Sequence, residues 1–292
     1  MNKKNNKLGW LFASPYVIYT IIFFMIPLIW GLFLAFTDWN LISPDYNKVG
    51  FRNFVTAVKS PGVIAAFWVT YKFMLMFVPI VIVSSLIVSL IIKAMPKFKA
   101  VFSVGYFLPY LASGVATSLV VKGILSYNSM LNIWLRKSYG LNIDWLNSKT
   151  LAPLVIAIMI AWKMVGYYSL IITSGLESIP EDVYEAAALD GATGIKKFFK
   201  ITLPLLYPSM YTVVIMAVGL VFGIFTEPYL LTGGGPNYAT NTWQMEIYNE
   251  AFGKLKAGYG SSIAILDALA TFATILVIKK LLEIWGKKNG WE

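Results

Sequence analysis

The stretch FMLMFVPIVIVSSLIVSLII, residues 73–92, contains twenty residues without a charged side chain. Twenty residues of α-helix rise about 30 Å, which matches the thickness of the hydrocarbon core of a bilayer. This stretch therefore predicts a helix that spans a membrane.

Five further charge-poor windows of similar length occur along the chain, and only Lys163 and Asp267 interrupt them. The first window has no small-residue cleavage site at its end, so we expect a retained span and not a cleaved signal peptide. We predict an all-α polytopic membrane protein in which residues 1–292 form a single transmembrane domain. Its expected spans are about 10–37, 65–92, 100–124, 151–175, 207–230 and 258–281.

The composition excludes several classes of protein. Hydrophobic residues make up 58% of the chain and charged residues only 13%, about half the charged fraction of a soluble domain. The absence of Cys and His excludes thiolate nucleophiles, zinc sites of those ligands and an imidazole base. The net charge of +10 is scattered between apolar runs, so we expect no nucleic-acid partner. We also expect no metal or cofactor bound by this chain.

The distribution of Lys and Arg predicts the orientation. If the N-terminus is cytoplasmic, the inner segments carry thirteen cations and the outer loops eight. Cytoplasmic loops are enriched in Lys and Arg, so six spans with this bias predict cytoplasmic N- and C-termini. The inner cations include Lys3, Lys4 and Lys7.

The segment ESIPEDVYEAAALDGATGIKKFFKITLPLLYP, 177–208, is too long for a simple turn. Ser178 with Glu181 predicts a capping box at a helix start, and Gly191 predicts the stop. The helix would place small side chains on one face, at Val183, Ala186, Ala187 and Asp190. Interfacial helices usually have large apolar anchors and a basic face. Alanines and acids instead favour docking to a protein, with a helix resting on lipid as the alternative.

The run Glu185-Ala186-Ala187, then Gly191 and Ile201-x-Leu203-Pro204, resembles the EAA signature of permeases of binding-protein-dependent ABC importers. The segments YFLP (106–109), DWL (144–146) and GLESIP (175–180) resemble further elements of that family. The segment TGGGP (232–236) and the residues after it are similar to an outer loop of its maltose-type and glycerol-phosphate-type, sugar-transporting branch.

This resemblance implies a type I ABC importer permease fold and a transmembrane subunit that moves a carbohydrate, in particular an oligosaccharide, into the cytoplasm. It implies that Glu185, Ala186, Ala187, Asp190 and Gly191 couple the chain to a partner ATPase through the loop 177–206. The implied partners are a second homologous permease forming a heterodimer, two ATPase subunits, an extracytoplasmic solute-binding protein and membrane lipid. ATP and Mg would be held by the ATPase, and this chain would not be an enzyme. The implied location is the bacterial or archaeal cytoplasmic (inner) membrane.

The resemblance also implies positions for the substrate path. Alignment outward from the EAA loop places Met164, Tyr167, Leu220, Val221 and Ile224 where the maltose permease lines its sugar site. Because these residues are largely apolar, the substrate cannot be carried over from maltose. A non-sugar or anionic substrate, such as a uronate or a glycerol phosphodiester, stays open.

Two charged residues, Lys163 and Asp267, lie near the middle of the fourth and sixth spans. A charge at that depth costs at least ~2.5 kcal/mol, so both should face the bundle interior or a wet cavity. We expect them to pair with each other or to line the path, with Glu227 as a further path candidate. An ion- or proton-coupled secondary transporter using Lys163 and Asp267 is the alternative, but it leaves the EAA segment unexplained. A membrane-embedded enzyme would need a cluster of polar groups at one depth.

Overall fold

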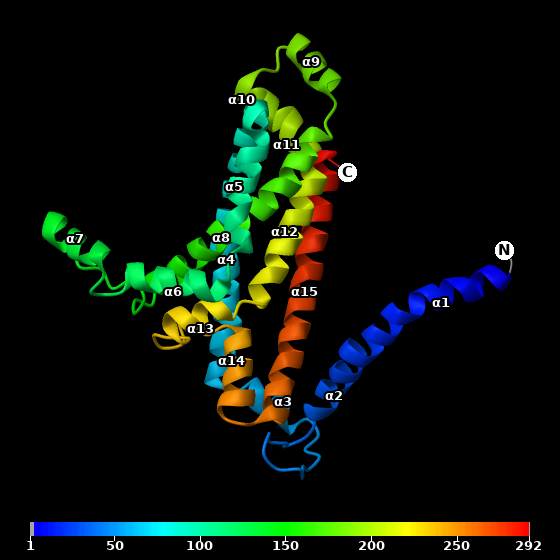
Figure 1. The fold of residues 1–292 in the computed structure, drawn as a ribbon, viewed down its shortest axis with the longest axis vertical. Coiled ribbons are helices and arrows are strands. Elements are labelled where there is room, and N and C mark those ends of the chain that lie inside the picture. Colours follow the sequence, from blue (N-terminus) through cyan, green and yellow to red (C-terminus); the bar gives the residue numbers. More distant parts are fainter. Residues whose placement is uncertain (1–2, 292) are drawn as a thin grey trace. The chain divides into compact units, whose positions relative to one another are not determined.

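The computed structural model describes residues 3–291, which form helices joined by turns and loops without a β-strand in that range (Figure 1). Residues 1, 2 and 292, and the side chains of residues 3–8 and 96, are outside this description. The predicted domain ends and the cations Lys3, Lys4 and Lys7 fall there. The all-α prediction is confirmed.

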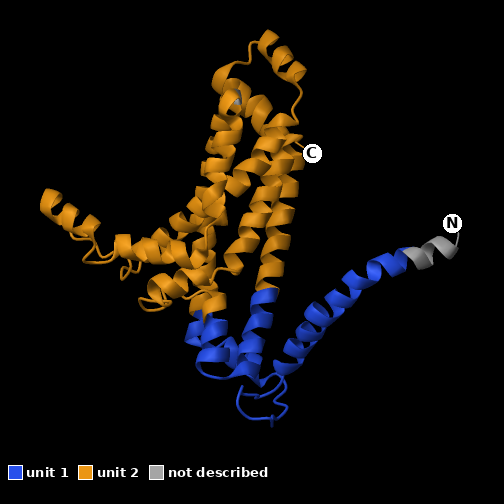
Figure 2. Cartoon of the chain, viewed as in Figure 1, with its two compact units in different colours: residues 1–64, 246–268 blue, residues 65–245, 269–292 orange. Residues whose placement is uncertain are grey.

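The chain divides into two compact units (Figure 2). Unit 1 comprises Met1–Ile64 and Glu246–Ala268, and unit 2 comprises Ala65–Met245 and Leu269–Glu292. The helices α4 (Pro61–Ala94) and α15 (Ala257–Asn289) run through both units. The apolar windows therefore show no break at the unit boundaries, and the sequence did not predict this division.

Four helical runs are long and apolar enough to cross a membrane: Gly9–Leu34, α4, α8 (Leu151–Glu177) and α15. The first run consists of α1 (Lys3–Thr20), the π-helical turn η1 (Ile21–Met25) and α2 (Ile26–Leu34). Up to six spans result if each of two bent helix pairs counts as one. Most of the residues of the first run are exposed, as expected for a helix whose surroundings are lipid or another chain.

The spans predicted at 100–124 and 207–230 are broken, which corrects the expectation of continuous helices. The segments Lys99–Leu111 and Gly114–Tyr139 are bent by 89°, because Ala112 is extended (φ −68°, ψ 138°) and ends α5 (Lys99–Leu111). A second bend, of 68°, lies just before the 207–230 window, between Gly194–Leu205 and Tyr207–Phe222. The window itself is broken because it holds two helices, α12 (Tyr207–Phe222) and α13 (Thr226–Thr232). Breaks at membrane depth are tolerated where protein surrounds the backbone.

Further helices and helical turns of unit 2 are α6 (Gly114–Leu125), α7 (Met130–Tyr139), α9 (Glu181–Leu189), α10 (Gly194–Lys197), η3 (Phe198–Thr202) and α11 (Leu203–Leu205). The helix α8 lies at the centre of the core of this unit, which includes fully buried Phe73, Tyr168 and Leu206. Hydroxyl groups of α4 bind carbonyls of α8, from Ser89 Oγ to Ser169 O at 2.9 Å and from Ser85 Oγ to Val165 O at 3.2 Å. Such small polar residues allow close helix packing in membranes.

Gly166 determines how closely α8 approaches α5. A Cβ at this position would overlap with the carbonyl group of Tyr106. The YFLP segment therefore packs directly on the backbone of α8, and only glycine permits this contact.

Unit 1 holds the first loop, α3 (Arg52–Ala57), part of α14 (Trp243–Tyr248), the π-helical turn η4 (Asn249–Gly253) and the start of α15. The Asn53 side chain donates to the carbonyls of Ala35 and Thr37 at 2.9 and 2.8 Å. The backbone amide of Gly258 donates to the carbonyl of Trp39 at 3.0 Å. These bonds tie the loop to the beginnings of α3 and α15.

Candidate functional site

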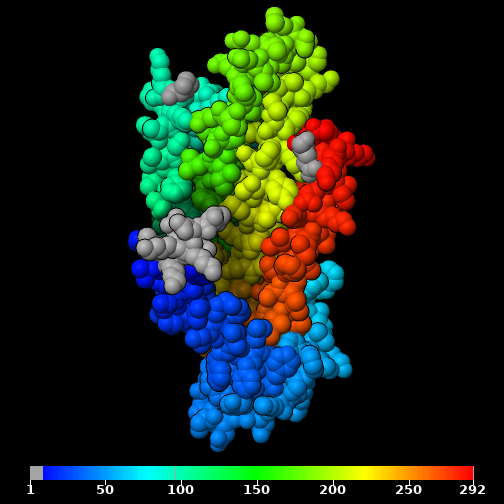
Figure 3. Space-filling view, turned by 90° about the vertical axis from the view of Figure 1, so that its right-hand side faces the viewer, coloured from blue at the N-terminus to red at the C-terminus, as the bar shows by residue number. Residues whose placement is uncertain are grey.

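The segment with the EAA pattern forms α9, which lies at one end of unit 2 (Figures 1 and 3). Glu181 and Asp182 occupy its first turn, where carboxylates favour the helix dipole. Gly191 follows with φ +72°, and the Ala192 amide donates back to the Ala187 carbonyl at 2.8 Å. The predicted glycine stop is confirmed, because only a left-handed residue allows this closure at low cost.

The predicted capping box is wrong. Pro180 is the N-cap residue and offers no side-chain acceptor, and Ser178 Oγ instead donates to the Gly175 carbonyl at 2.8 Å. Ser178 therefore belongs to the end of α8. The spacing of Ser178 and Glu181 fits a capping box, but α9 begins after Pro180, so Ser178 lies too early to cap it.

The predicted small-residue face of α9 divides between the inside and the outside of unit 2. Ala187 is buried, and Val183 packs against the hydrophobic core. Glu185, Ala186 and Asp190 are exposed. Large apolar side chains at the end of α9 and after it are also exposed, with exposed fractions of 90% for Leu189, 79% for Ile195 and 59% for Phe199. Exposed large apolar side chains are typical of a docking surface.

Tyr184 connects α9 to the spanning helices. Lys93, in the last turn of α4, places its Nζ 4.5 Å from the centre of the Tyr184 ring and 3.3 Å from its hydroxyl oxygen. The same Nζ donates to the Leu176 carbonyl of α8 at 3.2 Å. Lys197 approaches the ring at 5.4 Å. A cation–π and hydrogen-bond cluster therefore connects α9 to α4 and α8.

Sequence reasoning missed Tyr184, Lys93 and Lys197 as a group. Lys93 and Lys197 are two of the thirteen cations of the expected inner segments, and Tyr184 lies within the EAA helix without a pattern of its own. No spacing rule links residue 93 to residue 184, because their contact depends on how α4 and α9 fold back on α8.

Lys163 is buried in α8 and pairs with Glu227 in the first turn of α13, with Nζ to Oε1 at 3.4 Å. The two side chains are 8% and 12% exposed. Gly114, the first residue of α6, packs beside both charged groups. The pair therefore lies where two broken helices, α6 and α13, begin. Burial of a cation and a carboxylate together satisfies the expectation that neither stays alone in an apolar interior.

Asp267 is also buried, and it lies on α15 within unit 1. It has interactions with other groups of the chain. Its pairing with Lys163 stays a prediction. Glu227, expected only as a path residue, places a carboxylate oxygen within 4 Å of the Lys163 ammonium.

A second cation supports α13 from α6. Lys122 Nζ donates to the carbonyl of Leu230, near the C-terminal end of α13, at 2.8 Å. A cation at that end interacts favourably with the helix dipole. With Glu227 in its first turn and Lys122 at its last, α13 is held at both ends by charged groups.

A groove of about 740 Å³ runs between α5, α8 and α12 in unit 2. Tyr167 lines it and stacks on Tyr110, with ring centres 4.8 Å apart and an angle of 14° between the planes. Phe107 adds a further ring. Leu170, Ile171 and Pro208 add apolar lining, and the small or hydroxylated lining groups come from Ser174, Gly175, Ser178, Ser209 and Thr212.

The aligned path positions separate into two groups. Met164, Tyr167 and Leu220 are partly exposed, so they are accessible from a path. Val221 and Ile224 are 1% and 4% exposed and belong to the hydrophobic core of unit 2. Their role as path residues stays a prediction, because it requires a rearrangement of that core.

Comparisons with known proteins agree with this geometry. Residues 54–283 match the family model described as binding-protein-dependent transport system inner membrane component. The chain belongs to this family. It is a multi-pass membrane permease, as the EAA resemblance implied.

Curated relatives match over nearly the whole chain. The multiple sugar-binding transport system permease protein of Streptococcus mutans is 31% identical, over 94% of this chain and 95% of that protein. The trehalose/maltose transport system permease protein of Thermococcus litoralis is 27% identical, over 94% and 93%. A solved structure of a bacterial ABC transporter involved in import of the acidic polysaccharide alginate has a TM-score of 0.82, at 23% identity, over 96% and 97%. This structure confirms the type I ABC importer permease fold.

Proposed function

We propose that this chain is the transmembrane subunit of an ATP-driven importer that moves a neutral carbohydrate, in particular an oligosaccharide, into the cytoplasm. The observation that carries the proposal is the exposed outer surface of α9, backed by the Tyr184 cluster. That arrangement suits a chain that receives force from a partner. An ion- or proton-coupled secondary transporter built on Lys163 and Asp267 does not fit a family of binding-protein-dependent permeases.

The binding-protein-dependent family and the exposed surface of α9 together support the proposed partners. Two ATPase subunits would hold ATP and Mg, and one would receive Glu185, Ala186 and Leu189 in a groove. A second homologous permease would complete a heterodimer around the path, and an extracytoplasmic solute-binding protein would deliver substrate. We place the N- and C-termini in the cytoplasm of a bacterium or archaeon, which puts α9 on the ATPase side.

ATP-driven closure of the ATPase dimer would move α9 first. The Lys93 ammonium contacts both the Tyr184 ring and the Leu176 carbonyl, so α4 and α8 would follow the displacement. Motion of α8 relative to α5 and α12 would change the width of the groove that Tyr167 lines. Substrate release would then accompany the return of α9.

The chemistry of the groove favours a neutral sugar. Aromatic faces such as Tyr167 offer apolar contact to a sugar ring, and the serine and threonine hydroxyls can exchange hydrogen bonds with sugar hydroxyls. The nearby cation Lys163 is already neutralised by Glu227. An acidic sugar would have to displace that carboxylate. The relatives named for multiple sugars, arabinooligosaccharides and trehalose/maltose support the same substrate class.

The coupling role is tested with Glu185→Lys in the reconstituted complex. We expect loss of most substrate-stimulated ATP hydrolysis and uptake, because the new cation replaces an exposed carboxylate at the docking surface. Asp45→Lys, the same charge change at an exposed loop position, is the matched control and should retain both activities. Unchanged transport by Glu185→Lys would refute the docking role.

The substrate class is tested with Tyr167. Tyr167→Ala should lower uptake of a neutral oligosaccharide about tenfold, the equivalent of one lost aromatic contact of about 1.4 kcal/mol, and Tyr167→Phe should keep most of it. Binding-protein affinity for the sugar, measured by calorimetry, identifies the ligand independently. A binding protein specific for an acidic sugar or a non-sugar would contradict the neutral carbohydrate.

A further inference from the structure

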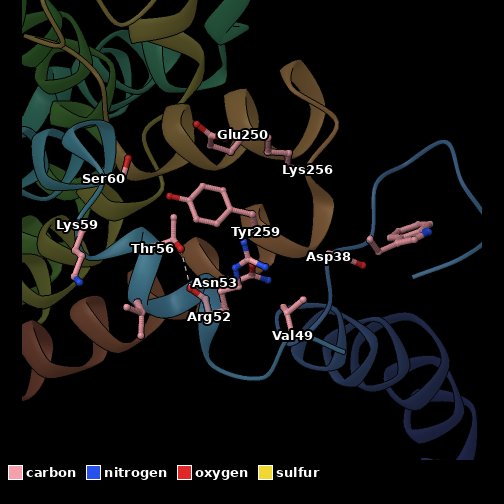
Figure 4. Close-up of a pocket in the computed structure, with 12 residues that line it drawn as sticks. Asp38, Val49, Arg52, Asn53, Thr56, Lys59, Ser60, Glu250, Lys256 and Tyr259 are labelled. Atoms are coloured by element: carbon pink, nitrogen blue, oxygen red, sulfur yellow. Dashed lines mark hydrogen bonds between the residues drawn. The ribbon is translucent and has the colours of Figure 1, made fainter. Parts of the chain in front are cut away.

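A cavity of about 810 Å³ lies in unit 1, bordered by α3, the loop before it and the start of α15 (Figure 4). Three cations line it, Arg52, Lys59 and Lys256. Figure 4 shows Arg52 and Tyr259 directed into the same space. Nothing in the proposed transport mechanism uses this cavity.

The two carboxylates of the cavity are held by other residues. Glu250 is 6% exposed, and its Oε1 lies 2.5 Å from the ammonium of Lys254. Asp38 accepts hydrogen bonds from the backbone amide and side-chain amide of Asn47 at 2.6 and 3.1 Å. These bonds stabilise the charged form and hold the pKa of Asp38 below its usual value.

The three cations are in a different situation. In the part of the chain that the structure describes, Arg52, Lys59 and Lys256 form no ion pair within 4 Å. Positive charge therefore exceeds the charge that the cavity itself neutralises. This excess favours an anionic ligand.

The helix α3 and the residues on either side of it carry both basic and apolar side chains. Residues at spacings of four and three face the cavity: Arg52, Thr56 and Lys59. Val55 also lines the cavity, whereas the apolar side chains of Phe51 and Val58 do not line it and are 71% and 56% exposed. Basic side chains beside exposed apolar side chains are typical of segments that lie in the membrane interface.

The position of the cavity at the ends of spanning helices also indicates the membrane interface. Lys59 and Ser60 directly precede α4, and Lys256 directly precedes α15. Both helices are long and apolar enough to span a bilayer. Cations and aromatic residues such as Trp39 at the ends of spans occur at headgroup level.

We propose that this cavity binds the headgroup of an anionic phospholipid. Arg52, Lys59 and Lys256 surround its phosphate. The planar guanidinium of Arg52 suits the paired oxygens of a phosphate. The exposed apolar side chains of Phe51 and Val58 contact the acyl chains. A free phosphate or an acidic sugar shares the negative charge but has no group for those apolar side chains.

The proposal is tested by native mass spectrometry of the full chain, purified with its associated subunits in detergent. Dioleoyl-phosphatidylglycerol and dioleoyl-phosphatidylethanolamine are added in competition. We expect Arg52→Gln, Lys59→Gln and Lys256→Gln each to lower the preference for phosphatidylglycerol about 5-fold, since a cation near a lipid surface contributes about 1 kcal/mol. The triple variant should lose the preference.

Arg52→Lys keeps the charge and should give a smaller loss than Arg52→Gln. Lys48→Gln is the control, because Lys48 lies in the same loop but does not line the cavity. The proposal would be overturned if Lys48→Gln and Arg52→Gln lost the preference for phosphatidylglycerol equally. It would also be overturned if no variant with the thermal midpoint of the unchanged protein lost that preference. Displacement of phosphatidylglycerol by inorganic phosphate or galacturonate at concentrations that match the lipid would show a soluble-anion site instead. None of these readouts depends on the transported substrate.

Discussion

Breaking the ion pair between Lys163 and Glu227 should destabilise unit 2 strongly. The charged atoms are 3.4 Å apart and about nine-tenths buried. At an effective dielectric constant of about 20, two unit charges at that separation attract by about 5 kcal/mol, much of which offsets their desolvation. Lys163→Met leaves the Glu227 carboxylate buried without its cation, and the expected cost is about 3–5 kcal/mol. Lys163→Met with Glu227→Gln removes both charges, so most of that cost should disappear.

The assay is a double-mutant cycle on denaturant unfolding in detergent, followed by tryptophan fluorescence. We expect the two single changes to be non-additive by about 2 kcal/mol or more. A parallel cycle of Lys163→Met with Asp267→Leu tests the pairing predicted from sequence, and a coupling there would show that Asp267 also acts on Lys163. Additive effects of Lys163→Met and Glu227→Gln would refute our reasoning about the buried pair.

Two further predictions concern packing and pH. Gly166→Ala should destabilise the chain by about 1–3 kcal/mol, because the new Cβ overlaps with the Tyr106 carbonyl. Gly105→Ala on α5 places its Cβ in open space and should be neutral or stabilising. The thermal unfolding midpoints of the two variants in detergent give the comparison. The pKa of Asp38 is lower in the folded chain than its unfolded value of about 3.9. The ionised carboxylate therefore stabilises the folded loop fully above about pH 3.9, and this stabilisation is lost as the pH falls through the folded pKa. Limited proteolysis of the loop should therefore speed up in acid, and Asp38→Asn should remove that dependence while weakening the bonds to Asn47 at neutral pH.

The sequence by itself determined the class of the protein. Charge-free windows near twenty residues long have one stable solution in a bilayer, the spanning helix, because the backbone must satisfy its own hydrogen bonds there. The sequence also predicted where α9 ends, because the left-handed conformation of the residue after a helix favours glycine and Gly191 supplies it. The spacing of the EAA segment indicated the permease family, which the match over 54–283 confirmed.

Only the tertiary structure decided which groups meet. Apolar windows have no feature that distinguishes a straight span from a broken one, so the bend after α5 and the separation of α12 from α13 were not predicted. Depth along a span suggested Asp267 as a partner of Lys163, which stays a prediction, but depth gave no indication that Glu227 pairs with Lys163. Glu227 reaches Lys163 because α13 begins at a break and turns its first residues toward α8. Contacts between residues far apart in sequence depend on that packing, and local pattern does not contain it.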